Sequence, residues 1–127
     1  MNELLRNHFR EAGQVLEETL DASAGSMARA ADLLVAACHA RQGIFLFGNG
    51  GSAADAQHVA GELNGRFSKE RRALKAQALV GDGASMTCIA NDYGYEQIFA
   101  RQLRANADPG DVAFGFSTSG NSGNVVE

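Results

Sequence analysis

The clearest structural signal in this chain is the segment Phe45-Leu46-Phe47-Gly48-Asn49-Gly50-Gly51-Ser52. It joins an apolar run to a glycine-rich turn, and its serine stands where a helix begins. A short run that is apolar at every position is typical of a strand buried on both faces of a parallel sheet. A second segment of the same design is Val112-Ala113-Phe114-Gly115-Phe116-Ser117-Thr118-Ser119-Gly120-Asn121-Ser122. We therefore expect two buried strands that end in similar polar turns.

The remaining segments alternate between strand and helix patterns. We predict three strands, at 44–47, 76–80 and 112–116, and four helices, at 52–64, 84–90, 94–106 and from 121 onward. Strands that alternate with helices form right-handed crossovers and a parallel sheet. The predicted fold is thus a three-layer α/β architecture with helices on both faces of a parallel sheet, similar to flavodoxin-like and Rossmann-like folds.

The N-terminal part of the chain has a helical pattern. One apolar stripe with spacings of three and four residues predicts a helix over 2–21; its members are Leu5, Phe9, Ala12, Leu16 and Leu20. Ser23 or Ser26 is a suitable cap for a second helix, which would end near Gly43. The sequence therefore predicts a helical hairpin over 1–42, followed by the α/β core over 43–127.

The length of the chain, 127 residues, is enough for one domain with its own core. There is no linker or low-complexity segment, so we predict a single domain over 1–127. The last helix would have only about six residues, which is short for a terminal helix. We therefore expect the domain to be incomplete at its C-terminus.

Charge and composition argue against several classes of partner. The formal net charge of −4 is unsuited to general nucleic-acid binding, although a local basic cluster lies within 66–75. No segment has the roughly 20 apolar residues of a membrane span, and the N-terminus lacks the pattern of a secretory signal. Cys38 and Cys88 are predicted to be buried free thiols in a reducing compartment. We expect a cytoplasmic protein that binds neither membranes nor nucleic acid.

The two polar turns are candidates for binding an anion. In open α/β sheets, ligands bind outside the carboxyl ends of the strands, where the amide groups of helix N-termini favour negative charge. Gly50 and Gly51 allow close approach of the backbone, and hydroxyl donors come from Ser52, Ser117, Thr118, Ser119 and Ser122. The alternative is that these residues only make tight turns and caps. Neither turn has the pattern of a P-loop or of a dinucleotide-binding loop.

A possible catalytic or metal-binding pair lies on the helix that follows the first turn. His58 and Glu62 are four residues apart, so they lie on one face of a helix. The pair suits a zinc or another divalent ion, and it equally suits a base held by a neighbour. The simplest alternative is an exposed helical pair worth a few tenths of a kcal/mol. Two ligands do not complete a tetrahedral zinc site, so we expect further ligands beyond Glu127.

Two further polar segments are weaker candidates. Asn91 and Asp92 form a polar turn between helices, and Asn-Asp is also a common pair at helix ends. Arg66 follows the helix that carries His58 and Glu62. It is placed either to clamp a sugar oxygen or a phosphate, or to remain solvated.

Taken together, these segments resemble the sugar isomerase (SIS) domain and, within it, the phosphoheptose isomerase family. The resemblance is carried by Gly48 to Phe67, by Asn91-Asp92-Tyr93-Gly94 and by Ser117 to Ser122. It implies conversion of sedoheptulose 7-phosphate into D-glycero-D-manno-heptose 7-phosphate through an enediol, an early step toward the ADP-heptose of lipopolysaccharide. It also implies a cytoplasmic homotetramer with zinc.

The resemblance further implies a role for each matching residue. His58 and Glu62 would be zinc ligands, and Glu62 would also act as the base and touch the substrate. The sugar would be contacted by Asn49, Gly50, Gly51, Asn91 and Asp92. The phosphate would be held by Ser52, Ser117, Thr118, Ser119 and Ser122. The remaining zinc ligands of the family, a Gln and a His, have no counterpart in this chain, so we expect the 127-residue piece alone to be inactive.

Two other readings of the same resemblance stay open. Some related proteins are adaptors that bind the bacterial replication initiator, and these tend to lose the position of Glu62. Others are sugar-phosphate sensors, which would bind the ligand without a metal. The presence of Glu62 in this chain favours the isomerase.

Overall fold

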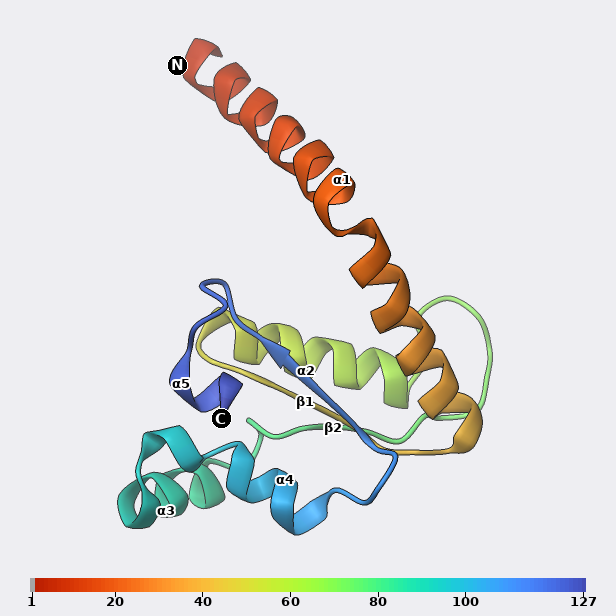
Figure 1. Ribbon diagram of the computed structural model, residues 1–127, viewed down its shortest axis with the longest axis vertical. Coiled ribbons are helices and arrows are strands. Elements are labelled where there is room, and N and C mark those ends of the chain that lie inside the picture. Colours follow the sequence, from red (N-terminus) through yellow and green to blue (C-terminus); the bar gives the residue numbers. More distant parts are fainter. Residues whose placement is uncertain (1) are drawn as a thin grey trace. The chain divides into compact units, whose positions relative to one another are not determined.

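The computed structural model describes residues 2–127 and has a small α/β core (Figure 1). Its elements, in chain order, are α1 (Asn2–Ala40), β1 (Ile44–Gly48), α2 (Gly51–Asn64), β2 (Ala76–Ala78), α3 (Gly83–Tyr93), the 3-10 helix η1 (Tyr95–Gln97), α4 (Ala100–Asn106), β3 (Val112–Phe116) and α5 (Gly123–Val126). The chain forms two compact units, one up to Leu33 and one from Leu34 to Glu127. The second unit contains the sheet.

The sheet has three parallel strands in the order β2-β1-β3. Ile44 of β1 pairs with Ala76 of β2 on one side and with Val112 of β3 on the other. The β1–β3 pairing continues to the ends of both strands, where Gly48 lies opposite Phe116. The predicted parallel α/β core is thus confirmed, and so is the position of each strand to within two residues.

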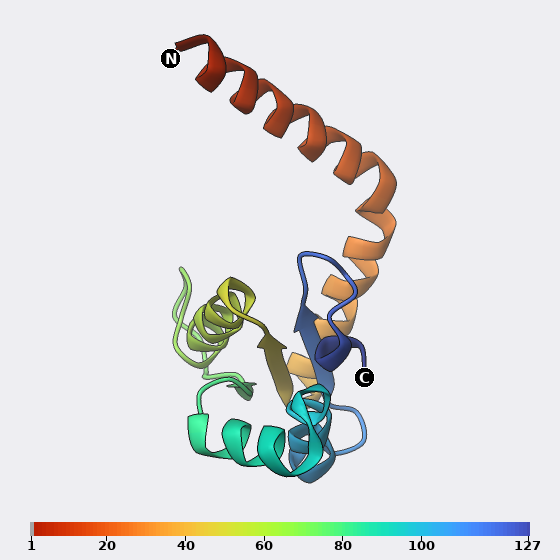
Figure 2. The same ribbon diagram turned by 90° about the vertical axis from the view of Figure 1, so that its left-hand side faces the viewer.

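Strand β1 is the centre of the core because every residue in it is buried. Successive side chains of a strand point to opposite faces, so β1 contributes to two separate apolar clusters. Ile44 and Leu46 pack with Ala56 and Ala60 of α2 and with the last turns of α1. On the other face, Phe45 and Phe47 pack with the segment around η1, where the rings of Phe47 and Phe99 are 5.0 Å apart. Figures 1 and 2 place α2 and α3 on opposite sides of β1.

Four predictions are wrong: the N-terminal hairpin, the turn at Asn91-Asp92, the single helix over 94–106 and the burial of both cysteines. Asn91 and Asp92 lie inside α3, and residues 94–106 form η1 and α4. Residues 2–40 form the single helix α1 instead of a hairpin. Gly25 costs about 1 kcal/mol in a helix and serine less, and no proline, which costs about 3 kcal/mol, stands between the two predicted helices. The Ser26 hydroxyl also accepts a bond from the Arg29 guanidinium instead of capping a new helix. Of the two cysteines predicted to be buried, Cys88 is exposed and Cys38 is only partly buried.

The apolar stripe of α1 is present as predicted but lies at the surface. Phe9 is 79% exposed and Leu16 is 71% exposed. Leu5 and Leu20, from the same stripe, are also exposed. Within residues 2–127, no helix combines the length and the apolar character needed to cross a membrane.

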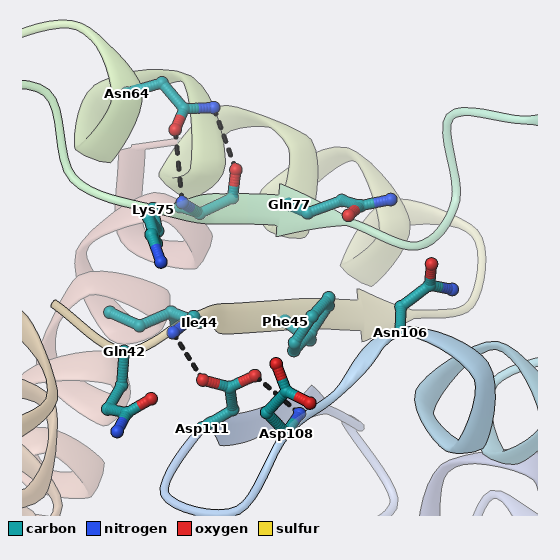
Figure 3. A pocket seen from close by; sticks show the side chains of 11 residues that line it. Gln42, Ile44, Phe45, Asn64, Lys75, Gln77, Asn106, Asp108 and Asp111 are labelled. Carbon is teal, nitrogen blue, oxygen red and sulfur yellow. Dashed lines mark hydrogen bonds between the residues drawn. The ribbon is translucent and has the colours of Figure 1, made fainter.

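At the amino ends of the strands, two side chains fasten loops to the sheet (Figure 3). The Asp111 carboxylate accepts hydrogen bonds from the backbone N–H of Gly43 at 2.6 Å and of Asp108 at 2.9 Å. The carboxamide of Asn64 bonds both the N–H and the C=O of Ala76, which joins the end of α2 to the start of β2. Two hydrogen bonds lower the pKa of the Asp111 carboxyl: the larger effect comes from the N–H of Asp108 and the smaller from the N–H of Gly43. Burial acts in the opposite direction.

The Asp111 contacts predict an acid-dependent loss of stability. Because the pKa of Asp111 is lower in the folded chain than in the unfolded chain, its contribution is complete above about pH 4 and is lost as pH falls through the folded pKa. Asp111→Asn should therefore lower the free energy of unfolding at pH 7, and the difference from wild type should shrink below about pH 4. Urea unfolding between pH 7 and pH 3 measures this.

Asp108→Asn is the matched control, because it removes a carboxylate from the same turn. It should leave the free energy of unfolding nearly unchanged. A difference between wild type and Asp111→Asn that stays constant down to pH 3 would contradict the assigned role.

Candidate functional site

The two polar turns begin side by side at the carboxyl edge of the sheet. The register that pairs Gly48 with Phe116 fixes this arrangement. Gly48 has no room for a side chain, since an added Cβ would lie 2.8 Å from the Phe116 carbonyl oxygen and 2.8 Å from the Cβ of Ser52. The glycine therefore allows β1, β3 and the start of α2 to meet at one point.

The first turn leaves the N-terminus of α2 without a side-chain cap. Gly50 stands at the N-cap position with φ +56°, a backbone conformation that glycine adopts readily. The amides of Ser52 and Ala53 bond back to the carbonyls of Asn49 and Gly50, at 3.0 and 3.1 Å. An uncapped helix N-terminus carries a partial positive charge and favours an anion.

The second turn gathers hydroxyl groups. The Ser117 hydroxyl lies 3.1 Å from that of Ser122 and 3.4 Å from that of Ser119. The Ser119 hydroxyl also accepts a bond from the backbone N–H of Asn121 at 3.2 Å. Thr118, from the same segment, is exposed. Three of the predicted phosphate-binding serines thus converge within one turn, next to the uncapped helix end.

A partly buried amide pair connects the two turns. The Nδ2 of Asn49 donates to the Oδ1 of Asn124, and the Nδ2 of Asn124 donates to the Oδ1 of Asn49, both at 2.8 Å. The Tyr95 hydroxyl donates to the same Oδ1 of Asn49 at 3.0 Å. Asn124 is only 5% exposed. Neither Asn124 nor Tyr95 was predicted from the sequence, although a polar residue next to an apolar one such as Val125, at the start of a helix, is a usable signal for a buried contact.

A hollow of about 440 Å³ opens next to this amide pair. It is lined by Asn49, Tyr95, Glu96, Ser122, Gly123 and Asn124. Asn49 and Ser122 were predicted to bind sugar and phosphate, respectively. The hollow therefore lies where ligands bind in open α/β sheets, at the carboxyl ends of the strands.

His58 and Glu62 come together on the outer surface of α2. The Nε2 of His58 is 3.9 Å from the Oε1 of Glu62, and the two side chains are 75% and 35% exposed. The opposite side of the helix, with Ala56 and Ala60, packs on the sheet. At 1.5 Å per residue, His58 lies about 9 Å and Glu62 about 15 Å along the helix from Ser52, and side chains lean toward the helix N-terminus.

The donor atoms of this pair fit two positions of a zinc site. Zinc accepts a histidine nitrogen and a carboxylate oxygen at about 2.0–2.2 Å, which puts the two donors about 3.3 Å apart in a tetrahedral site. The distance of 3.9 Å between them would need only a small side-chain movement. In residues 2–127, His, Cys, Asp and Glu side chains form no group of three that could hold a metal ion.

The remaining candidates do not join these groups through any contact in the described part of the chain. Asn91 donates to the neighbouring Asp92 at 2.8 Å, and the thiol of Cys88 lies 3.7 Å from the same carboxylate, at the end of α3. Arg66 lies beyond the C-terminal end of α2, where its guanidinium is 3.4 Å from the Glu70 carboxylate. Their proposed contacts with the sugar stay predictions.

A second hollow, of about 330 Å³, lies at the opposite edge of the sheet (Figure 3). Its lining includes Lys75, Asp108 and Asp111, and none of the predicted site residues. The Asp111 carboxylate is already bonded to two backbone amides. We place the functional site at the carboxyl edge, because that edge has the helix N-terminus and the hydroxyl cluster.

Comparison with known proteins finds close relatives. The sequence profile of the SIS domain matches residues 7–127. The chain is 48% identical over 126 residues to phosphoheptose isomerase of Aquifex aeolicus, covering 99% of this chain and 66% of the relative. It is 52% identical over 119 residues to phosphoheptose isomerase of Geobacter sulfurreducens, covering 94% and 63%. The chain thus spans a little under two thirds of the length of these two curated relatives.

Two solved structures share this architecture. Phosphoheptose isomerase GmhA from Neisseria gonorrhoeae superimposes with a TM-score of 0.86 at 40% sequence identity. A phosphoheptose isomerase from Francisella tularensis does so with a TM-score of 0.89 at 35% identity. Each match covers 98% of this chain and 65% of the solved chain.

The crowding around Gly48 predicts an effect on stability. In Gly48→Ala, the added methyl would overlap the Phe116 carbonyl and Ser52, so the free energy of unfolding should fall by about 1–3 kcal/mol. Gly61→Ala is the control, because nothing lies within 4 Å of an added Cβ and alanine favours the helix interior. Gly61→Ala should raise the free energy of unfolding by up to about 1 kcal/mol. Equal effects of the two changes in urea unfolding would show that the β1–β3 junction tolerates a side chain.

Proposed function

Because the chain belongs to the phosphoheptose isomerase family of SIS domains, we propose that the protein is an aldose–ketose isomerase. Its substrate is sedoheptulose 7-phosphate, and its product is D-glycero-D-manno-heptose 7-phosphate, a cytoplasmic precursor of the ADP-heptose used for lipopolysaccharide. The observation that carries the proposal is the meeting of the serine cluster and the uncapped N-terminus of α2 at one edge of the sheet.

The phosphate group of the substrate binds at this meeting point. A phosphate dianion needs several short donors, and the Ser117 hydroxyl already lies 3.4 Å from that of Ser119 and 3.1 Å from that of Ser122. The N-terminus of α2 adds a favourable dipole. No cationic side chain is required. Binding the phosphate end positions the carbonyl end of the sugar, which lowers the entropic part of the barrier.

Glu62 acts as the base that transfers the proton during the isomerisation. Its carboxylate removes a proton from C1 of the ketose, next to the C2 carbonyl, and an enediol forms. Return of a proton to C2 leaves the carbonyl at C1 and completes the aldose. Glu62 lies on the outer surface of α2, further along the helix than the phosphate site. The carbonyl end of the sugar reaches this surface, while the carbons next to the phosphate lie beside Asn49.

We propose that His58 and Glu62 also hold a zinc ion, through the Nε2 and Oε1 atoms that now lie 3.9 Å apart. A bound divalent ion would polarise the carbonyl and stabilise the negative charge that develops on its oxygen. The donor types support this assignment, and the remaining ligands come from outside the described residues. Because His58 stands four residues before Glu62, both donor atoms lie on one face of α2.

We further propose that the active protein is a homotetramer. The exposed apolar stripe of α1, which includes Phe9 and Leu16, supports this proposal. Contiguous exposed apolar side chains mark interaction surfaces in soluble proteins. Association through this stripe would remove it from water, and each buried side chain of this size is worth about 1.5–3 kcal/mol.

If the serine cluster holds the phosphate, removing its hydroxyls should weaken substrate binding. The double change Ser117→Ala and Ser122→Ala should raise the Kd for sedoheptulose 7-phosphate at least about tenfold, because hydrogen bonds to a charged group contribute about 1.5–3 kcal/mol each. Isothermal titration calorimetry on the whole protein measures this. Ser23→Ala, on α1, is the control and should leave the Kd unchanged. Unchanged affinity in the double variant would place the phosphate elsewhere.

Glu62→Gln separates an isomerase from a binding protein. The change keeps the shape of the side chain and removes the base, so turnover should fall by about 10²–10⁴-fold while sugar-phosphate binding is retained. Isomerisation is followed in the whole protein with sedoheptulose 7-phosphate, and metal content is measured alongside. A wild-type protein that binds the sugar phosphate without turnover would be a sensor, and one that neither binds nor turns it over would be an adaptor.

A further inference from the structure

We propose that Asn124 and Tyr95 are positioning residues that fix Asn49 as a single hydrogen-bond donor to an acceptor oxygen of the bound sugar. The inference rests on the proposed function and names a contact within its site. Asn49 and Asn124 form a reciprocal amide pair with both bonds at 2.8 Å, and the Tyr95 hydroxyl donates to the Oδ1 of Asn49 at 3.0 Å.

The hydrogen-bonding capacity of Asn49 is almost fully used. A carboxamide has two N–H donors and an oxygen with two lone pairs. The Oδ1 of Asn49 receives one bond from Asn124 and one from Tyr95, so both lone pairs are occupied. One N–H of Nδ2 donates to Asn124. A single side-chain N–H remains, and the side chain of Asn49 can offer a ligand nothing else.

The geometry of the pair sets the direction of the remaining N–H. In a reciprocal amide pair, each nitrogen uses the hydrogen on the same side as its own carbonyl oxygen. The other hydrogen of Asn49 therefore points away from Asn124. Asn49 lines the hollow of about 440 Å³ together with Ser122, whose hydroxyl belongs to the serine cluster. The free N–H is available to a ligand that occupies this hollow.

The network also makes the two turns depend on each other. Asn49 belongs to the turn after β1, Tyr95 to η1 and Asn124 to α5, two residues after Ser122. The amide of Val125 bonds to the Ser122 carbonyl at 2.8 Å, so the backbone around Asn124 also sets the position of Ser122. Replacing the side chain of Asn124 leaves this backbone bond in place, so the change acts on the Asn49 donor and not on Ser122.

The chemistry of the partner atom follows from this arrangement. A group that only donates requires an oxygen that accepts, which here is a hydroxyl oxygen of the sugar chain, because the carbonyl lies at Glu62. Inorganic phosphate does not reach beyond the serine cluster and does not need this contact. The affinity for the sugar phosphate should therefore depend on Asn124 and Tyr95, and the affinity for inorganic phosphate should depend on them much less.

The test compares two ligands and three variants by titration calorimetry of the whole protein. Asn124→Leu keeps the side-chain shape and removes both amide bonds. Tyr95→Phe removes only the hydroxyl of a half-exposed residue, so it should fold normally. Tyr93→Phe is the control, because the ring of Tyr93 packs against Arg101 and takes no part in the network.

For sedoheptulose 7-phosphate, we expect the Kd to rise about tenfold in Asn124→Leu and about threefold in Tyr95→Phe. For inorganic phosphate, both changes should stay below about twofold, and Tyr93→Phe should change neither Kd. In ¹⁵N-edited NMR spectra of the chain, Tyr95→Phe should shift the Nδ2 signals of Asn49.

The outcomes separate the inference from the proposed function. If wild type binds sedoheptulose 7-phosphate and Asn124→Leu and Tyr95→Phe bind it equally well, the positioning role is wrong and the proposed function stands. An equal loss of affinity for both ligands means a general structural role and also overturns the inference. If wild type does not bind the sugar phosphate, the proposed function fails, and the inference fails with it.

Discussion

The backbone pairing between β1 and β3 is the constraint on which the site depends. These strands are separated by more than 60 residues in the sequence, yet their register places Gly48 directly opposite Phe116. The turns that follow therefore start at the same edge, and the lack of a side chain at Gly48 lets α2 begin close to the end of β3. A shift of register by one residue would turn the side chains of β3 to the opposite face and move the serine cluster away from the helix N-terminus.

The contrast between the two edges of the sheet also follows from parallel pairing. Helix N-termini gather at the carboxyl edge, where α2 starts without a cap and the serine hydroxyls converge. Helix C-termini gather at the amino edge, where the side chains of Asp111 and Asn64 form hydrogen bonds with backbone groups of neighbouring segments. Polar side chains at one edge are thus free to bind a ligand, while those at the other edge stabilise the fold.

Much of this arrangement could be predicted from the sequence, because its signals are local. The apolar run before Gly48 and the similar run before Ser117 identified β1 and β3, and the spacing of His58 and Glu62 placed both on one face of α2. The break expected near Ser26 was wrong, because a serine that can cap a helix is also tolerated inside one. Asn124 and Tyr95 were missed because they contact Asn49 from 75 and 46 residues away, and no periodicity records such a pairing.

The most direct test of this account is a crystal structure of the protein soaked with sedoheptulose 7-phosphate. We expect the phosphate within hydrogen-bond distance of the Ser117, Ser119 and Ser122 hydroxyls and beside the N-terminus of α2, with the sugar chain extending past Asn49. A phosphate bound instead at the amino edge, beside Lys75, would contradict the claim that the β1–β3 junction creates the anion site.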